Sequence, residues 1–166
     1  GLRSVALRIT NPYGHFQRRE QNRYGIINWF IHLAVNRGEL PIYGDGDQLR
    51  DYVHVDDVVR AFLGAGSTPQ ADGRVLNGGG GSGERFREMA DIVVREAGGG
   101  TIVHRPWPQE AAKVETGDFV ADISQAQAVL GWTPRMPLAA GLREVVEQYR
   151  ELLSARLLLT SRRRTG

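Results

Sequence analysis

The chain has 166 residues, of which 41% are hydrophobic and 24% charged, and this composition is typical of one soluble globular domain with a buried core. It contains no cysteine, which excludes a disulfide framework, thiolate catalysis and a cysteine-based zinc site. The formal net charge is only +2, and basic residues do not alternate with aromatic ones, so we expect no nucleic-acid partner. There is no apolar run long enough for a bilayer and no signal-peptide core, so we expect a cytoplasmic protein with no membrane partner.

The first part of the chain alternates strand-like and helical patterns. Residues 5–9 (VALRI) predict a short strand. Apolar residues then recur at helical spacing from Tyr24 onward, and Gly38 ends that predicted helix. Residues 40–44 predict a second strand, and residues 50–55 an extended segment.

Two helices are predicted in the central region. Asp56 and Asp57 open the first, where their carboxylates suit the positive end of the helix dipole. Its expected buried face comprises Val55, Val58, Val59 and Phe62. Ser82 is the expected N-cap of the second helix, and Gly98 its C-terminal stop. Its expected apolar stripe comprises Phe86, Met89, Ala90, Val93, Val94 and Ala97.

The last third predicts one strand and two helices. Residues 101–105 (TIVHR) form the strand, and Asp122 with Gln125 makes a capping-box pair before a short helix that runs to Leu130. The inward face expected for the final helix comprises Leu142, Val145, Val146, Tyr149, Leu152 and Leu153. Strands that alternate with helices predict a layered α/β fold.

A glycine-rich corner follows the strand-like residues 74–77. Gly78, Gly80 and Gly83 match the G-x-G-x-x-G spacing of a dinucleotide-binding loop. That loop also requires an acidic residue at the end of the next strand, to bind ribose, but the next strand ends in Arg105. Successive glycines equally suit a strand-to-helix turn.

The chain holds no complete metal-binding or hydrolase motif. Residues 45–56 place aspartates at the first, third and twelfth positions of an EF-hand-like loop, but Arg50 stands where glycine is needed, so we expect no calcium. The sequence also holds no G-x-S-x-G hydrolase elbow. The four histidines show no metal-ligand spacing, so we expect no metal site; they are His15, His32, His54 and His104.

Residues 50–54 concentrate polar side chains in a short stretch. In a strand, Arg50, Tyr52 and His54 would project from one face. An arginine can bind a phosphate or carboxylate through two parallel hydrogen bonds. An internal salt bridge between Arg50 and a nearby aspartate explains the arginine equally well, and the sequence leaves both open.

Four segments, in order, resemble the NAD-dependent epimerase/dehydratase family, the extended short-chain dehydrogenase/reductases that act on nucleotide sugars. They are RITNPYG (8–14), LPIYGDGDQLRDYVHVDDVVRA (40–61), LNGGGG (76–81) with the helix after it, and ETGDFVADISQAQAVLGWTPRMPLAAGLREVVEQY (115–149). UDP-glucose 4-epimerase and its relatives are the nearest group. The resemblance implies an α/β fold: the C-terminal part of a Rossmann-type fold with the small substrate-binding lobe, without the N-terminal cofactor-binding half.

The resemblance also assigns the glycine corner. In the family, NAD or NADP binds a loop near the N-terminus, whereas LNGGGG corresponds to a corner of the C-terminal half. The catalytic Y-x-x-x-K is likewise expected upstream, and none of the five tyrosines has a lysine four positions later. We therefore expect this chain alone to be inactive, with residues 1–154 forming the substrate-binding portion and residues 155–166 a frayed basic tail.

The resemblance implies a set of substrate-binding residues: Asn11, Leu40, Ile42, Tyr43, Arg50 and Asp118. Asn11 would hydrogen-bond the sugar nucleotide near its diphosphate, Arg50 would grip the diphosphate, and Asp118 would contact the ribose. The strand that holds residues 40–43 would lie against the base. For Asn11 and Asp118, turn capping is the alternative.

One position departs from the family pattern. Glu115 replaces the arginine of the family's R-x-G-D, and a carboxylate beside a diphosphate repels it. Arg105 or Lys113 could supply the lost charge, or the pocket could prefer another nucleotide.

Three functional hypotheses remain open at this stage. The chain is the substrate-binding portion of an NAD(P)-dependent nucleotide-sugar epimerase or dehydratase, a non-catalytic module that binds sugar nucleotides, or a subunit completed by a separate Rossmann chain. A UDP-sugar is the expected ligand. The unpaired strand at 5–9 further predicts a homo-oligomer, with exchanged strands or helices.

Overall fold

A computed structural model describes residues 2–17 and 25–162, with side chains as far as Ala155. The expected helix start at Tyr24 and the tail residues 163–166 therefore lie outside the described residues. Within the described part of the chain, no helix combines the length and apolar character needed to cross a bilayer.

The strands of the described residues form short paired ladders rather than one wide sheet. Three of these ladders are parallel and one is antiparallel. The parallel ladders are β1 (Ala6–Ile9) with β6 (Val75–Gly78), β2 (Asn11–Tyr13) with β5 (Tyr52–His54), and β3 (Glu39–Tyr43) with β8 (Thr101–Arg105). The antiparallel ladder pairs β4 (Leu49–Arg50) with β7 (Glu84–Arg85).

The helices alternate with these strands along the chain, which confirms the α/β class. They are α1 (Ile26–Val35), α2 (Val55–Ser67), the 3₁₀ turn η2 (Pro69–Ala71), α3 (Phe86–Ala97), α4 (Gln109–Val114), α5 (Ser124–Leu130) and α6 (Leu138–Arg162). Because α6 continues to Arg162, the segment expected as a tail begins inside this helix.

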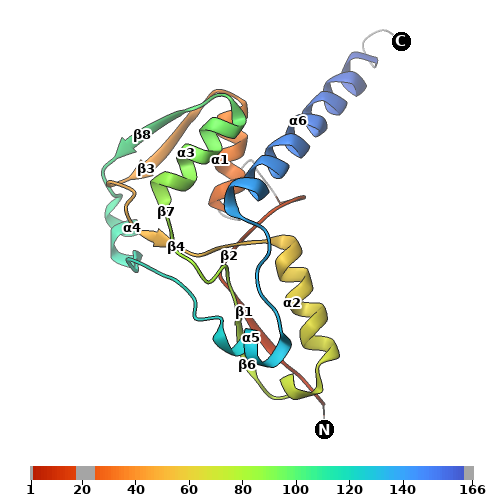
Figure 1. Cartoon of the computed structure of the whole chain (residues 1–166). Coiled ribbons are helices and arrows are strands. Elements are labelled where there is room, and N and C mark those ends of the chain that lie inside the picture. The colour runs from red at the N-terminus through yellow and green to blue at the C-terminus, as the bar shows by residue number, and fades with distance from the viewer. Residues whose placement is uncertain (1, 18–24, 163–166) are drawn as a thin grey trace.

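Two clusters of buried side chains stabilise the fold at opposite ends of the molecule (Figure 1). The larger one packs α1, α3 and α6 against β3, and Phe30, Leu40 and Val145 are wholly buried in it. The smaller one packs α5 and α2 against β1 and β6, around Leu76 and Trp132. The β2–β5 ladder contributes Tyr13 and Tyr52 to the larger cluster.

Several predictions from local pattern are confirmed. The strands expected at residues 5–9, 40–44 and 101–105 correspond to β1, β3 and β8. Gly98 ends α3 in the left-handed conformation, with φ of 57°, which glycine adopts without a steric penalty.

The predicted buried face of α2 is wrong. Val59 and Phe62 are 49% and 56% exposed, whereas the inner face carries Asp57, Ala61 and Ala65. These residues recur every four positions, so they form one stripe. The buried carboxylate of Asp57 accepts hydrogen bonds from the segment before α6, and the small alanines allow close packing beneath it. The apolar side chains are therefore left on the outer face.

Both predicted N-caps are also wrong. Helix α3 begins at Phe86 rather than after Ser82, because Glu84 and Arg85 pair with β4 first. Helix α5 has Ile123 as its N-cap, while the Asp122 carboxylate accepts a hydrogen bond from the Ser124 N–H at 2.9 Å in a turn just before the helix.

On α6 the expected inward face is confirmed through Tyr149, but Leu152 is 46% exposed. The large buried cluster covers α6 as far as Leu153, which is only partly buried. Beyond that point the helix extends away from the other elements (Figure 1).

Candidate functional site

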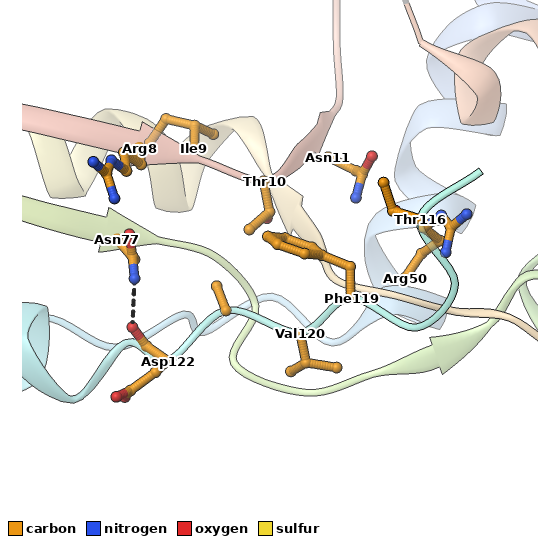
Figure 2. Close-up of a pocket in the computed structure, with 11 residues that line it drawn as sticks. Arg8, Ile9, Thr10, Asn11, Arg50, Asn77, Thr116, Phe119, Val120 and Asp122 are labelled. Carbon is orange, nitrogen blue, oxygen red and sulfur yellow. Dashed lines mark hydrogen bonds between the residues drawn. The ribbon is translucent and has the colours of Figure 1, made fainter. Parts of the chain in front are cut away.

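A cavity of about 530 Å³ opens beyond the carboxyl ends of β1 and β6 (Figure 2). In open parallel α/β sheets, ligands bind at this edge. Polar and apolar side chains line the cavity around the phenyl ring of Phe119, and the polar ones include Arg8, Asn11, Arg50, Asn77 and Asp122.

Asp51, between β4 and β5, organises one wall of this cavity. Its side chain is wholly buried, and its carboxylate accepts hydrogen bonds from the backbone N–H groups of Gly80 and Ala121, the latter at 2.9 Å. A further contact comes from the Gly81 N–H at 3.4 Å. One carboxylate thus joins the glycine corner to the segment that lines the cavity, and a buried anion is stabilised by such donors.

The glycine corner is shaped for this carboxylate. A Cβ atom on Gly80 would lie 2.3 Å from the Tyr52 carbonyl oxygen, and one on Gly79 would lie 2.5 Å from Asp51 Oδ2, so neither position accommodates a side chain. The amides of Gly80 and Gly81 are directed at an internal acid. In this structure they are therefore not available to the phosphates of a dinucleotide.

Arg50 lies at one end of the cavity and is held by three groups. Its guanidinium donates to the carbonyl oxygens of Gly117 at 2.6 Å and Leu49 at 2.9 Å, and it forms an ion pair with Glu115. Of the two alternatives that the sequence left open, the internal salt bridge is present, but with this glutamate rather than an aspartate.

Asn11 lies near Arg50 on the same side of the cavity (Figure 2). Its amide Nδ2 donates to the Asp51 carbonyl oxygen at 3.0 Å. This bond uses one amide hydrogen, and the amide has a second hydrogen and a carbonyl oxygen with which to contact a ligand.

The other residues expected at the site lie elsewhere. Asp118 accepts a hydrogen bond from the Leu49 N–H at 2.8 Å and does not line the cavity, so it fixes the loop to β4. Leu40 and Ile42 are wholly buried in the larger core cluster. Tyr43 packs beside Trp107, with ring centroids 5.5 Å apart. The structure thus brings Asn11 and Arg50 together but not the four others.

The expectation that Arg50, Tyr52 and His54 share one strand face is wrong. The chain changes partners at Asp51, because β4 pairs with β7 whereas β5 pairs with β2. Arg50 lines the large cavity, while His54 is buried beside Tyr13, with ring centroids 5.2 Å apart.

Neither buried tyrosine near the β2–β5 ladder suits the role of a catalytic base. Burial raises the pKa of the Tyr52 hydroxyl, and Glu84 adds to that effect while Arg50 opposes it. Burial also raises the pKa of the Tyr13 hydroxyl, and the carboxylates of Asp57 and Glu144 add to the shift. Both hydroxyls therefore stay protonated at neutral pH, whereas a base must lose its proton.

Sequence reasoning missed several residues of the cavity. Arg8 and Asn77 are paired in register one residue before the ends of β1 and β6, and the Asn77 amide donates to the Asp122 carbonyl oxygen at 2.9 Å. Phe119 projects between the two arginines (Figure 2). The position of Arg8 and Asn77 near strand ends was the available signal, since such ends converge on ligand sites in parallel sheets.

Comparisons with known proteins agree with this architecture. Residues 1–79 match the model of the NAD dependent epimerase/dehydratase family. A putative UDP-glucose 4-epimerase of Methanocaldococcus jannaschii is 32% identical over 148 residues, which are 88% of this chain and 45% of that protein. A dTDP-glucose 4,6-dehydratase of Streptomyces griseus is 32% identical over 90% of this chain and 43% of its own length.

Solved structures give the same result. The UDP-glucose 4-epimerase of Thermotoga maritima with UDP-glucose superposes with a TM-score of 0.82 at 32% identity, over 92% of this chain and 47% of that one. The UDP-glucuronic acid 4-epimerase of Bacillus cereus, with UDP-glucuronic acid and NAD, gives 0.75 at 27% identity, over 89% and 45%. The chain thus spans a little under half the length of the relatives it matches, and it belongs to the NAD dependent epimerase/dehydratase family.

Proposed function

We propose that this chain supplies the substrate-holding part of a nucleotide-sugar epimerase or dehydratase, and that the sugar nucleotide binds in the large cavity with its diphosphate near Arg50 and Asn11. The observation that carries the proposal is the position of these two side chains in one cavity beyond the ends of β1 and β6. The matched relatives include epimerases solved with UDP-glucose and with UDP-glucuronic acid.

The charges around the cavity favour a ligand with an anionic and a neutral polar part. Arg8 and Arg50 lie at its two ends, and Asn11 and Asn77 line it between them (Figure 2). Within the described residues, the Arg8 guanidinium forms neither a hydrogen bond nor an ion pair with the protein. A pyrophosphate would contact cationic guanidinium groups, while sugar hydroxyls suit asparagine amides and the Asp122 carboxylate.

NAD or NADP, which the family description implies, would supply hydride acceptance and return when bound. Within the described residues, the glycine corner offers no cradle for it, because the N–H groups of Gly80 and Gly81 are directed at Asp51. The role of this chain is therefore to bind and orient the sugar nucleotide, and we expect no NAD reduction by the chain alone.

Isothermal titration calorimetry with UDP-glucose and dTDP-glucose tests the proposal. We expect saturable heat with at least one of them, and at least about a tenfold loss of affinity in Arg50→Ala, because a charge-assisted hydrogen bond contributes about 1.5–3 kcal/mol. Arg95→Ala removes the same charge from the exposed face of α3 and serves as the matched control. Absence of heat with every nucleotide sugar, or equal affinities for the two variants, would contradict the proposal.

The two alternatives differ from this proposal in one measurement each. A non-catalytic module would bind the sugar nucleotide and show no activity with any added Rossmann chain. A subunit completed by a separate chain would gain spectrophotometric NAD reduction when mixed with that chain. Within the described residues, β1 has a strand partner only in β6, so its other edge is open to such an addition.

A further inference from the structure

Two histidines and a glutamate from three separate segments meet on the side of the β2–β5 ladder that faces α6. His15 follows β2, His54 ends β5, and Glu144 lies in the second turn of α6. One ligand atom of each residue lies within 4.8 Å of the corresponding atoms of the other two. His15 Nε2 donates to Glu144 Oε1 at 2.6 Å, although these residues are 129 positions apart in the sequence.

The His54 ring is the observation that points to a ligand. Its side chain is wholly buried, and its Nε2 atom has no hydrogen-bond partner in the structure. The other ring nitrogen, Nδ1, accepts a hydrogen bond from the Asp56 N–H at 3.3 Å and lies 3.8 Å from Oδ2 of the same residue. A buried polar atom without a partner costs about 1–3 kcal/mol, so a fold that retains one calls for an explanation.

The surroundings restrict what could satisfy this ring. The His54 and His15 rings meet edge to face, with centroids 5.7 Å apart, and Tyr13 closes another side. A Cβ atom on Gly141 would lie 2.3 Å from the Tyr13 hydroxyl, so α6 approaches the ladder closely here. The Glu144 side chain is 45% exposed and therefore has room to adjust.

We propose that His15, His54 and Glu144 bind a divalent transition-metal ion, with Zn²⁺ as the best match, through two imidazole nitrogens and one carboxylate oxygen. Two histidines and one glutamate are an established zinc donor set, and imidazole disfavours Mg²⁺ and Ca²⁺, which prefer oxygen ligands. With zinc–ligand bonds of about 2.0–2.2 Å, tetrahedral ligand atoms lie about 3.3–3.6 Å apart. His15 Nε2 and Glu144 Oε1, which lie 2.6 Å apart in the structure, must therefore move apart by about 0.7–1.0 Å to bind one ion.

The metal would join α6 to the β2–β5 ladder and leave a fourth coordination position for water. None of its three ligands lines the large cavity, so this site is distinct from the one proposed for the sugar nucleotide. A ligand that binds only the folded chain stabilises it by mass action. The metal would therefore act as a cross-link between segments that are distant in sequence.

The test uses the untagged full chain after treatment with a chelator. Titration with ZnCl₂ in the calorimeter should give one site per chain with a Kd in or below the micromolar range, a raised thermal midpoint, and no such response to MgCl₂. Co²⁺ should give the visible absorption bands of a tetrahedral site. We expect His15→Gln and Glu144→Gln, at partly exposed positions, each to weaken Zn²⁺ binding at least tenfold.

Matched controls separate this site from unspecific binding. His104→Gln changes an exposed histidine on β8, and Glu147→Gln changes an exposed glutamate on α6, three residues beyond Glu144. Both should bind Zn²⁺ like the parent chain, and circular dichroism should show that all four variants are folded. The proposal is overturned if Zn²⁺ gives no heat, or if the site variants and the controls bind it equally well.

Discussion

At the scale of single residues, the main question is how an anionic ligand would reach Arg50. The guanidinium already forms an ion pair with Glu115, at the position where the family resemblance implies an arginine. Both side chains are mostly buried, with 18% and 23% of their surfaces exposed, so their attraction is only partly screened by water. A diphosphate at Arg50 would have to displace this carboxylate or bind beside it.

Glu115→Gln should therefore strengthen the binding of UDP-glucose, by about three- to tenfold, because removal of one carboxylate frees the guanidinium and relieves repulsion worth about 1 kcal/mol. Calorimetry on the parent chain and the variant measures the change. Glu110→Gln removes the same charge from an exposed position in α4, where Glu110 pairs with Lys113, and should leave the affinity unchanged.

A double variant assigns the effect to the ion pair. In an Arg50→Ala background, Glu115→Gln should improve affinity by much less than in the parent chain, because the guanidinium it releases is no longer present. If Glu115→Gln weakened binding instead, the carboxylate would be positioning Arg50 for the ligand rather than competing with it.

At the scale of elements, Asp57 connects α2 to the segment between α5 and α6. Its carboxylate accepts from the backbone N–H groups of Arg135 and Met136, both at 3.0 Å, and pairs with Arg60. Its carbonyl oxygen accepts from the Trp132 indole at 3.0 Å. Burial alone would raise the pKa of Asp57, but the two backbone hydrogen bonds and Arg60 together lower it below its ordinary value of 3.8.

The contribution of Asp57 to stability should consequently depend on pH. A carboxylate with a lowered pKa stabilises the fold above about pH 4, its ordinary titration range, and loses that contribution as the pH falls through the folded-state value. Asp57→Asn should cost about 2–3 kcal/mol in urea denaturation at pH 7, since one amide oxygen cannot replace all these acceptor contacts.

The difference in unfolding free energy between the parent chain and Asp57→Asn should then become smaller when urea denaturation is repeated near pH 3. Asp91→Asn, at an exposed position of α3, should change stability little at either pH. If the difference in unfolding free energy were the same at both pH values, the charge of Asp57 would not be what stabilises the contact.

The helices and strands differ in how well the sequence could predict them. Strands β1, β3 and β8 and the end of α3 follow from alternation and from Gly98, which are local signals. The buried face of α2 could not be predicted from local signals, because it depends on hydrogen bonds between Asp57 and Arg135, which are 78 positions apart. Hydrophobic periodicity assigned Val59 and Phe62 to the core, whereas a buried acid requires donors that only the folded chain supplies.

At the candidate site, too, some residues could be predicted from the sequence and others could not. The family resemblance of residues 8–14 and 40–61 singled out Asn11 and Arg50, and both line the same cavity. Asp51 could not be predicted, since its role depends on glycine amides 29 and 30 positions away. The proximity of His15, His54 and Glu144 could not be predicted from the spacing of the histidines, since the three residues come from segments that are distant in the sequence.

At the scale of the whole molecule, the β1–β6 ladder is covered by the described helices on one face only. One face packs on α5 and α2, whereas the other exposes Ala6 and Val75, the latter by 53%. The Ala6 N–H donates to the Arg74 carbonyl oxygen at 3.0 Å, so by strand alternation the Leu7 N–H points to the opposite edge. Within the described residues no strand pairs with that edge.

An open strand edge beside an uncovered apolar face favours pairing with a second copy of the chain. We therefore predict that the chain self-associates at micromolar concentration, as light scattering coupled to size exclusion would measure.

Ala6→Lys places a charge on the uncovered face and should shift the mass toward that of a monomer, because a strand edge that carries lysine resists addition. Ala140→Lys adds the same charge at an exposed position of α6 and should leave the mass unchanged. If the parent chain were a monodisperse monomer, β1 would be protected in solution and the prediction would be wrong. If both variants lowered the measured mass equally, the effect would come from net charge rather than from the strand edge.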